Sequence, residues 1–394
     1  LANEPTTLVM NGSLSKDIEA TISCLESMGA HIIKDGGLYT VNPITQRKNE
    51  FTLDCGESGS TLRFLLPVAA AIGADFHVSG QGRLPQRPLM PLIKAMRENG
   101  CCFSSDTLPF KVGGGLESGE FSLPGDISSQ FISGLLFALP TLGGNSKIVL
   151  TSSLESVGYV NMTIDALQKF GIRVERGQNS FIINGSQKYK SCKTVRVQGD
   201  WSNAAFWLAA GALSGGITVT GLSESSVQGD MAICNIVKSI GARVEIHENS
   251  VTVSRGSLNA ISIDASDIPD LVPVIAAALS IAEGKSLIYN ISRLRLKESD
   301  RLRTVALALN SIGADIKENE NSLEIKGREA LSGGVADSFN DHRIAMSLAV
   351  ASIACKNKLT ITNAQAVEKS YPEFFTHFMQ LGGKCDVVRV GQQN

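Results

Sequence analysis

The chain has 394 residues and a formal net charge of −2, with 43% hydrophobic and 19% charged residues. This globular composition excludes a disordered chain, and its near-neutrality argues against a dedicated nucleic-acid-binding protein. The longest apolar stretch, residues 271–282, is shorter than the ~18 residues of a membrane span. No signal peptide is visible, and the eight cysteines lack metal-site spacing. We therefore expect a cytoplasmic protein with reduced thiols, no metal, and no nucleic-acid or membrane partner.

A glycine motif recurs six times along the chain, at intervals of 69 to 72 residues. Each copy follows an amphipathic helix and reads an apolar residue, Gly, a small residue or Cys, any residue, then an apolar residue or Cys. Asn99 departs from the apolar first position, and Ile172 is larger than the residue after the other glycines. The six glycines are Gly29, Gly100, Gly171, Gly241, Gly313 and Gly382. Glycine at this place suits a helix end that needs a left-handed backbone before a strand. The spacing therefore predicts six repeated units.

A second helix, apolar on nearly all sides, precedes five of these glycines by about forty residues. These predicted helices span residues 60–72, 128–142, 202–213, 269–282 and 341–354. Their pattern is typical of helices buried inside a domain. Alternating strands such as 218–220 and 251–253 lie between them. We predict an α/β (α+β) fold of two lobes, residues 1–198 and 199–394, each with three repeated βα units.

The same period places a sixth buried helix ahead of residue 1. We therefore expect the first unit to be incomplete, without its opening strand and nearly all of its inner helix. Residues 1–4 would then form the last turn of that helix.

The buried helices begin with polar residues, and cationic side chains gather beside those starts. A helix N-terminus attracts anions, although Ser, Asp and Asn are also ordinary N-caps. Arg87 lies in a Pro-stiffened loop and Arg343 at a helix start, while residues 293–301 form a run of mixed charge that also suits a solvated face. Five helix starts in register favour a shared anion-binding cleft. Asp341 and His342 suit a capping or structural role better than a catalytic dyad.

Nine segments distributed over the chain together resemble the enolpyruvyl transferase family, in particular its members that act on shikimate 3-phosphate. They are residues 56–63, 82–88, 128–131, 156–159, 228–230, 268–270, 296–302, 340–343 and 369–372. The family fold has two lobes of three similar βα units, in agreement with the period found in the chain.

The resemblance implies transfer of the carboxyvinyl group of phosphoenolpyruvate to the 5-hydroxyl of shikimate 3-phosphate, with release of phosphate, in aromatic amino-acid biosynthesis. It implies no cofactor and no metal, inhibition by glyphosate, and a monomer whose partners are its two substrates. The residues implied for shikimate 3-phosphate are Ser128, Ser129, Gln130, Ser156, Tyr159, Asp270 and Lys297. Those implied for phosphoenolpyruvate are Gly59, Arg87, Gln130, Arg301, Arg343 and Lys369. The expected catalytic residues are Asp270, which accepts the hydroxyl proton, Glu298, which exchanges a proton with the vinyl methylene, and Lys297.

Two departures from the family pattern stand out. The family carries a Lys-Ser…Arg segment on its first inner helix, which would lie before Leu1, so we expect the chain as given to turn over poorly. Glu57 stands where many members have Asn.

Two other functions stay open: a non-catalytic ligand-binding scaffold, and the related UDP-N-acetylglucosamine enolpyruvyl transferase. That relative carries a reactive Cys in the loop that corresponds to residues 82–88, where this chain has none.

Overall fold

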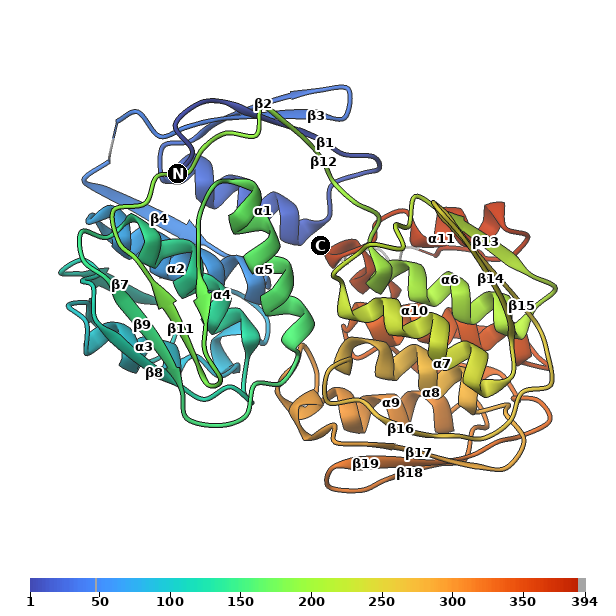
Figure 1. The fold of residues 1–394 in the computed structure, drawn as a ribbon. Coiled ribbons are helices and arrows are strands. Elements are labelled where there is room, and N and C mark those ends of the chain that lie inside the picture. Colours follow the sequence, from blue (N-terminus) through green and yellow to red (C-terminus); the bar gives the residue numbers. More distant parts are fainter. Residues whose placement is uncertain (47, 389–394) are drawn as a thin grey trace, which may run out of the picture.

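The computed structural model describes residues 1–46 and 48–388, which form two lobes side by side (Figure 1). One hydrophobic core draws its buried residues from Cys24 to Tyr189, and a second draws them from Trp201 to Phe374. The boundary that we propose, between residues 198 and 199, falls between the two cores. Residues 389–394 of the proposed second lobe lie outside the described residues.

The second unit shows the plan of the repeat. Strand β4 (Glu50–Asp54) leads into inner helix α2 (Gly59–Ile72), and β5 (Asp75–Ser79) returns parallel to β4. The outer helix α3 (Met90–Arg97) and the antiparallel strands β6 (Cys102–Phe103) and β7 (Phe110–Gly113) complete the unit, giving the strand order β4-β5-β7-β6. A parallel pair joined through a helix forms a βαβ crossover, which buries the inner helix against the sheet.

The later units repeat this plan with small variations. Their strands form the sheets β10-β11-β9-β8, β13-β15-β14, β16-β17-β19-β18 and β20-β21. The bounds are β8 (Glu120–Leu123), β9 (Ser146–Leu150), β10 (Glu175–Arg176), β11 (Ser180–Ile183), β13 (Ile217–Thr220), β14 (Arg243–His247), β15 (Ser250–Ser254), β16 (Ser262–Asp264), β17 (Lys285–Tyr289), β18 (Ile316–Glu318), β19 (Ser322–Lys326), β20 (Gly334–Asp337) and β21 (Leu359–Thr362). The pairs β8/β9, β16/β17 and β20/β21 are parallel, like β4/β5.

The first unit corrects two of our expectations. Its sheet has the order β12-β1-β3-β2, formed by β1 (Thr6–Val9), β2 (His31–Asp35), β3 (Leu38–Asn42) and β12 (Thr194–Arg196). Strand β12 pairs in parallel with β1 and so fills the place of the opening strand that we expected to be absent. Residues 1–4 are not helical, because Ala2 forms a β-bridge with Tyr189. The two ends of the first lobe thus meet in one sheet.

The helices agree closely with the predicted pattern. The other inner helices are α4 (Ser129–Ala138), α6 (Trp201–Leu213), α8 (Val272–Leu279) and α10 (His342–Ala351), and most of their residues are buried. The other outer helices are α1 (Lys16–Ser27), α5 (Val157–Lys169), α7 (Ile233–Ile240), α9 (Arg301–Asn310) and α11 (Phe374–Gln380). All six repeat glycines follow an outer helix with φ between +79° and +110°. The predicted helix ends and the α/β repeat fold are confirmed.

Among the residues that the structure describes, seven short 3-10 helices connect or extend these elements. They are η1 (Leu84–Gln86), η2 (Leu139–Thr141), η3 (Gly229–Ala232), η4 (Pro269–Leu271), η5 (Ser292–Leu296), η6 (Ser352–Ala354) and η7 (Ala364–Lys369). The predicted inner helices 128–142, 269–282 and 341–354 each include one of them. Within the described residues, no helix is long and apolar enough to cross a membrane.

Close packing of α2 against α4 sets the spacing of two helix starts in the first lobe. Gly134 of α4 lies against the backbone of α2, and a Cβ added there would overlap the carbonyl oxygen of Arg63. The absence of a side chain at Gly134 therefore allows the two inner helices to approach each other.

We expect Gly134→Ala to lower the free energy of unfolding by about 1–3 kcal/mol, because backbone atoms must move to admit the methyl group. Gly143→Ala is the matched control, since a Cβ there meets no atom within 4 Å, and its effect should stay within about 0.5 kcal/mol. Urea unfolding of both variants measures the difference. Equal stabilities of the two variants would contradict this account of the helix contact.

Candidate active site

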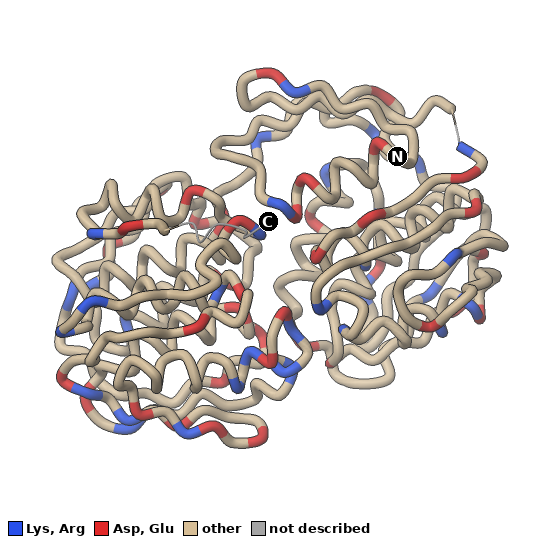
Figure 2. Tube along the Cα trace, turned by 180° about the vertical axis from the view of Figure 1, so that it is seen from behind, with Lys and Arg blue, Asp and Glu red and all other residues tan. Residues whose placement is uncertain are grey.

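A cavity of about 430 Å³ lies between the lobes and is lined by residues from both. Charged residues of both signs occur where the lobes meet (Figure 2). Ten of the predicted site residues line the cavity: Arg87, Ser128, Ser129, Gln130, Ser156, Tyr159, Asp270, Lys297, Glu298 and Arg343. These ten residues are spread over more than two hundred positions of the sequence. The fold therefore brings together groups that are distant along the chain.

The first lobe contributes hydroxyl groups from two helix starts. Ser128 is the N-cap residue of α4, and Ser129 is its first residue. Ser156 is the N-cap residue of α5 and has a left-handed backbone, with φ of 56°. Helix starts carry unpaired N–H groups and a partial positive charge, so this side of the cavity favours an anion.

Asp270, on η4 of the second lobe, is surrounded by cations. Its carboxylate lies 3.2 Å from Lys297, 2.8 Å from Arg301 and 3.5 Å from Arg343. The hydroxyl of Tyr159, from the first lobe, donates to it at 3.1 Å. Burial alone would raise the pKa of Asp270, but Arg343, Lys297 and Arg301 together hold it well below its usual value. Asp270 is therefore ionised at neutral pH.

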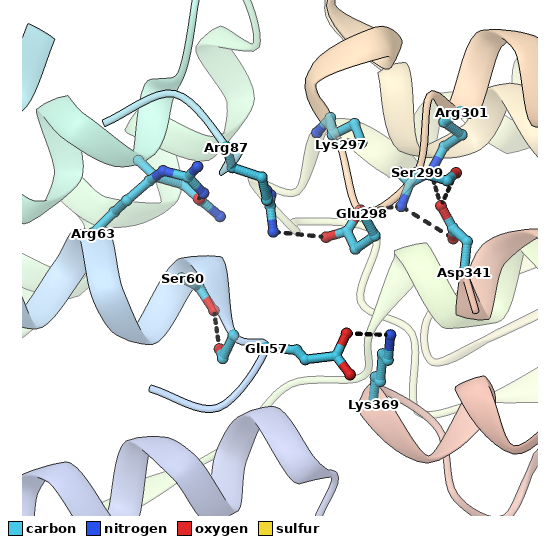
Figure 3. A network of polar contacts seen from close by, with 12 residues as sticks. Glu57, Ser60, Arg63, Arg87, Lys297, Glu298, Ser299, Arg301, Asp341 and Lys369 are labelled. Atoms are coloured by element: carbon cyan, nitrogen blue, oxygen red, sulfur yellow. Dashed lines mark hydrogen bonds and ion pairs between the residues drawn. The ribbon is translucent and has the colours of Figure 1, made fainter. Parts of the chain in front are cut away.

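Glu298 is the second carboxylate of the cavity. It pairs with Arg301 of α9 and, across the gap between the lobes, with Arg87 at 3.4 Å (Figure 3). Burial would raise its pKa, but Arg301 and Arg87 hold the pKa well below the usual value. Two ionised carboxylates thus share one cationic pocket.

Arg301 lies behind these carboxylates, outside the residues that line the cavity. Its side chain is 1% exposed and contacts Asp341 through Nε at 2.9 Å and Nη2 at 3.2 Å. Asp341 also accepts from Ser299 at 2.9 Å and caps α10 through the backbone N–H of Arg343. The predicted capping role of Asp341 is therefore observed. The structure places Arg301 where it fixes the carboxylates.

Lys369 also lies outside the cavity lining, because Glu57 holds its ammonium group at 2.7 Å (Figure 3). The backbone oxygen of Asn340 accepts from the same group at 2.7 Å. This ion pair connects the loop before α2 with η7 of the second lobe. Glu57 thus pairs with a cation that the resemblance assigns to phosphoenolpyruvate.

Gly59 begins α2 beside two guanidinium groups. A Cβ at this position would lie 2.5 Å from Nη1 of Arg63 and 2.7 Å from Nη1 of Arg87. Gly59 itself does not line the cavity, and its lack of a side chain leaves room for these two cations.

A family model described as EPSP synthase (3-phosphoshikimate 1-carboxyvinyltransferase) matches residues 1–378. The chain belongs to the EPSP synthase family.

Curated relatives support this membership over nearly the whole chain. A 3-phosphoshikimate 1-carboxyvinyltransferase of Clostridium acetobutylicum is 44% identical over 99% of this chain and 92% of its own length. The Clostridium kluyveri protein of the same name is 44% identical over 98% and 91%. A solved EPSP synthase structure from Acinetobacter baumannii has a TM-score of 0.78 at 23% identity, covering 96% of this chain and 90% of that one, and so shows the shared fold.

Sequence reasoning missed three charged cavity residues, Asp17, Arg63 and Arg293. Arg63 donates to Gln130 at 3.0 Å, and burial with the nearby Arg87 lowers its pKa to about 9. It follows Gly59 by one helical turn, a spacing that could have indicated the site. Burial, with the charge of Glu298, raises the pKa of Asp17 to about 6. No signal in the sequence marks Asp17 as a cavity residue.

His342 lines the cavity, and its Nδ1 atom is buried without a hydrogen-bond partner in the part of the chain that the structure describes. Burial, reinforced by Arg343, lowers the pKa of His342 to about 4. The ring is therefore neutral at pH 7. Across the two described ranges, no group of His, Cys, Asp and Glu side chains has the arrangement of a metal site.

Asp230, on η3, is a buried carboxylate next to the site and accepts from Tyr159 at 3.4 Å. Burial, with the charge of Asp270, raises its pKa to about 6. Because the pKa of Asp230 is higher in the folded than in the unfolded protein, protonation of Asp230 stabilises the fold. This stabilisation is complete below the unfolded-state value of 3.8 and is lost as the pH rises through about 6.

Asp230→Asn removes this ionisation while keeping an oxygen that can accept from Tyr159. We expect the variant to gain stability over the wild type as the pH rises, by about 1 kcal/mol more at pH 8 than at pH 5. Urea unfolding at the two pH values measures this, with Glu245→Gln on an exposed strand as the control. An equal effect of Asp230→Asn at both pH values would contradict the raised pKa.

Proposed function

We propose that the cleft binds phosphoenolpyruvate and shikimate 3-phosphate and transfers the carboxyvinyl group to the 5-hydroxyl of the latter. The observation that carries this proposal is the pair of carboxylates, Asp270 and Glu298, set among cations from both lobes. Two substrates that bear phosphates and carboxylates need such convergent cations, and charge-assisted hydrogen bonds contribute about 1.5–3 kcal/mol each. Relatives named 3-phosphoshikimate 1-carboxyvinyltransferase at 42–44% identity support this substrate over a UDP-sugar.

The division of the site follows from where its hydroxyl groups and cations lie. Ser128, Ser129 and Ser156 would hold the phosphate of shikimate 3-phosphate at the two helix starts of the first lobe. Gln130, Tyr159 and Lys297 would contact the same substrate. Arg87 and Arg343 would hold phosphoenolpyruvate. Lys369 would join them after Glu57 releases its ammonium group, and the absence of a side chain at Gly59 would leave space for the substrate.

The chemistry is an addition followed by an elimination. Asp270 accepts the proton of the 5-hydroxyl as the hydroxyl oxygen bonds to C2 of phosphoenolpyruvate, and Glu298, after it takes up a proton from water, donates that proton to the methylene carbon. Loss of a proton from the resulting methyl group, with Glu298 as the exchanging carboxylate, then expels phosphate and restores the double bond. Lys297 contacts Asp270 at 3.2 Å and stabilises its charged form.

Asp270 would become a stronger base when the substrates bind. Its low pKa is caused by three cations, and two of them, Arg343 and Lys297, also line the cavity. Substrate anions that share those cations would weaken their effect on Asp270 and raise its pKa toward the working pH. Proton acceptance would thus follow substrate binding.

We expect phosphate release from phosphoenolpyruvate only when shikimate 3-phosphate is also present, and Asp270→Asn to lower kcat by about 10²–10⁴-fold, the range for a lost general base. The measurement is a phosphate-release assay combined with ³¹P NMR of the enolpyruvyl product. Glu283→Gln, an exposed carboxylate in the same lobe, is the control and should retain wild-type turnover. Unchanged turnover in Asp270→Asn would remove Asp270 from the mechanism, and phosphate release without shikimate 3-phosphate would contradict the proposed transfer.

A further inference from the structure

Arg293 reaches from the second lobe into the part of the cavity formed by the first. It lies on η5, and its side chain is 12% exposed. Nη2 donates to Ser156 Oγ at 2.9 Å and to the backbone oxygen of Ser266 at 2.6 Å, while Nε pairs with Glu155. Arg293 also lines the cavity together with Ser128 and Ser129. The guanidinium is thus held at the serine-rich end of the site.

This end of the site needs a cation. The three serines supply only neutral hydroxyls, whereas a phosphate monoester carries close to two negative charges at pH 7. Lys297 is already paired with Asp270, and its pKa is lowered by burial and by Arg301. Arg293 is a guanidinium that already contacts one of the serines.

The neighbours of Arg293 orient its side chain but leave the guanidinium able to bind an anion in the cavity. Glu155 and Ser266 contact the side chain, and neither residue lines the cavity. Glu155 is partly exposed, at 32%, so water screens its attraction for the guanidinium. Arginine presents several donors in a planar fork and can therefore keep these contacts while donating to phosphate oxygens.

We propose that Arg293 binds the phosphate group of shikimate 3-phosphate beside Ser156 and determines selectivity for the phosphorylated substrate over shikimate. This inference rests on the proposed function, and it assigns Arg293 as a specificity-determining residue. Because Arg293 and Ser156 belong to different lobes, a phosphate bound between them also contacts both halves of the site.

The test compares two ligands that differ only in the phosphate. Shikimate 3-phosphate is titrated by calorimetry and shikimate by NMR chemical shifts, into the wild type and Arg293→Gln. We expect the dissociation constant for shikimate 3-phosphate to rise about 10- to 100-fold, the effect of one charge-assisted hydrogen-bonding group. The constant for shikimate should stay within about twofold, because that ligand lacks the group that Arg293 binds.

Two further variants separate phosphate binding from a purely structural role. Glu155→Gln weakens the same contact between the lobes but keeps the cation, and should leave the selectivity ratio within about threefold of the wild type. Arg293→Lys keeps the charge without the planar fork, and should give an intermediate loss for shikimate 3-phosphate. It also supplies the comparison if Arg293→Gln does not fold, as judged by circular dichroism.

Equal losses for both ligands, or an unchanged affinity for shikimate 3-phosphate, would overturn the role of Arg293 while leaving the proposed function intact. A wild-type protein that binds shikimate no more weakly than shikimate 3-phosphate would contradict the inference and the proposed substrate together. The two failures are therefore distinguishable.

Discussion

The organisation of the site depends on one buried guanidinium. Arg301 contacts Asp341, Glu298 and Asp270, which come from three separate segments of the second lobe. Removing charges from water costs several kcal/mol per ion, so such a cluster is stable only when each charge has well-placed partners. Burial would lower the pKa of Arg301, but the three carboxylates raise it above its usual value. Arg301 is therefore a permanent charge that fixes the positions of both proposed catalytic carboxylates.

Most of the remaining cations around this centre have a carboxylate partner, whereas Arg63 donates to Gln130. Arg87 reaches Glu298 from the first lobe, and Lys369 meets Glu57 across the same gap. These pairs are partly accessible, whereas Arg301 is not. In the proposed mechanism, substrate anions would exchange with the accessible carboxylates without disturbing the buried cluster. Binding and proton transfer would also be connected, because Arg343 and Lys297, which we propose contact the substrates, hold the pKa of Asp270 low.

Much of the fold was predictable because it rests on local rules repeated at a regular period. All six repeat glycines have the left-handed backbone that the pattern predicted, and the five inner helices lie close to their predicted bounds. The pairing of β12 with β1 in the first sheet was not predictable. A three-residue strand shows little periodicity, and β1 lies about 190 residues away in the sequence. The non-helical start of the chain results from the same pairing between the two ends of the first lobe.

The site residues that belong to a sequence motif were predictable. Those whose place in the cavity depends only on the three-dimensional arrangement were less so. The motifs identified ten residues that line the cavity, but they could not show that Arg301 is buried or that Glu57 engages Lys369. Arg63 and Arg293 reach the site through the directions of their side chains, and Asp17 reaches it through the packing of α1. Such placements depend on tertiary contacts between segments that no local pattern connects.

The most direct test of this account is the turnover of Arg301→Lys with both substrates, measured beside its affinity for shikimate 3-phosphate. A lysine has a single ammonium group and cannot hold three carboxylates in the planar geometry of a guanidinium. We predict a kcat lowered by about 10²-fold or more, because small misplacements of reacting groups have effects of that size, with affinity for shikimate 3-phosphate within about threefold of the wild type. A kcat equal to that of the wild type would contradict the central role of Arg301.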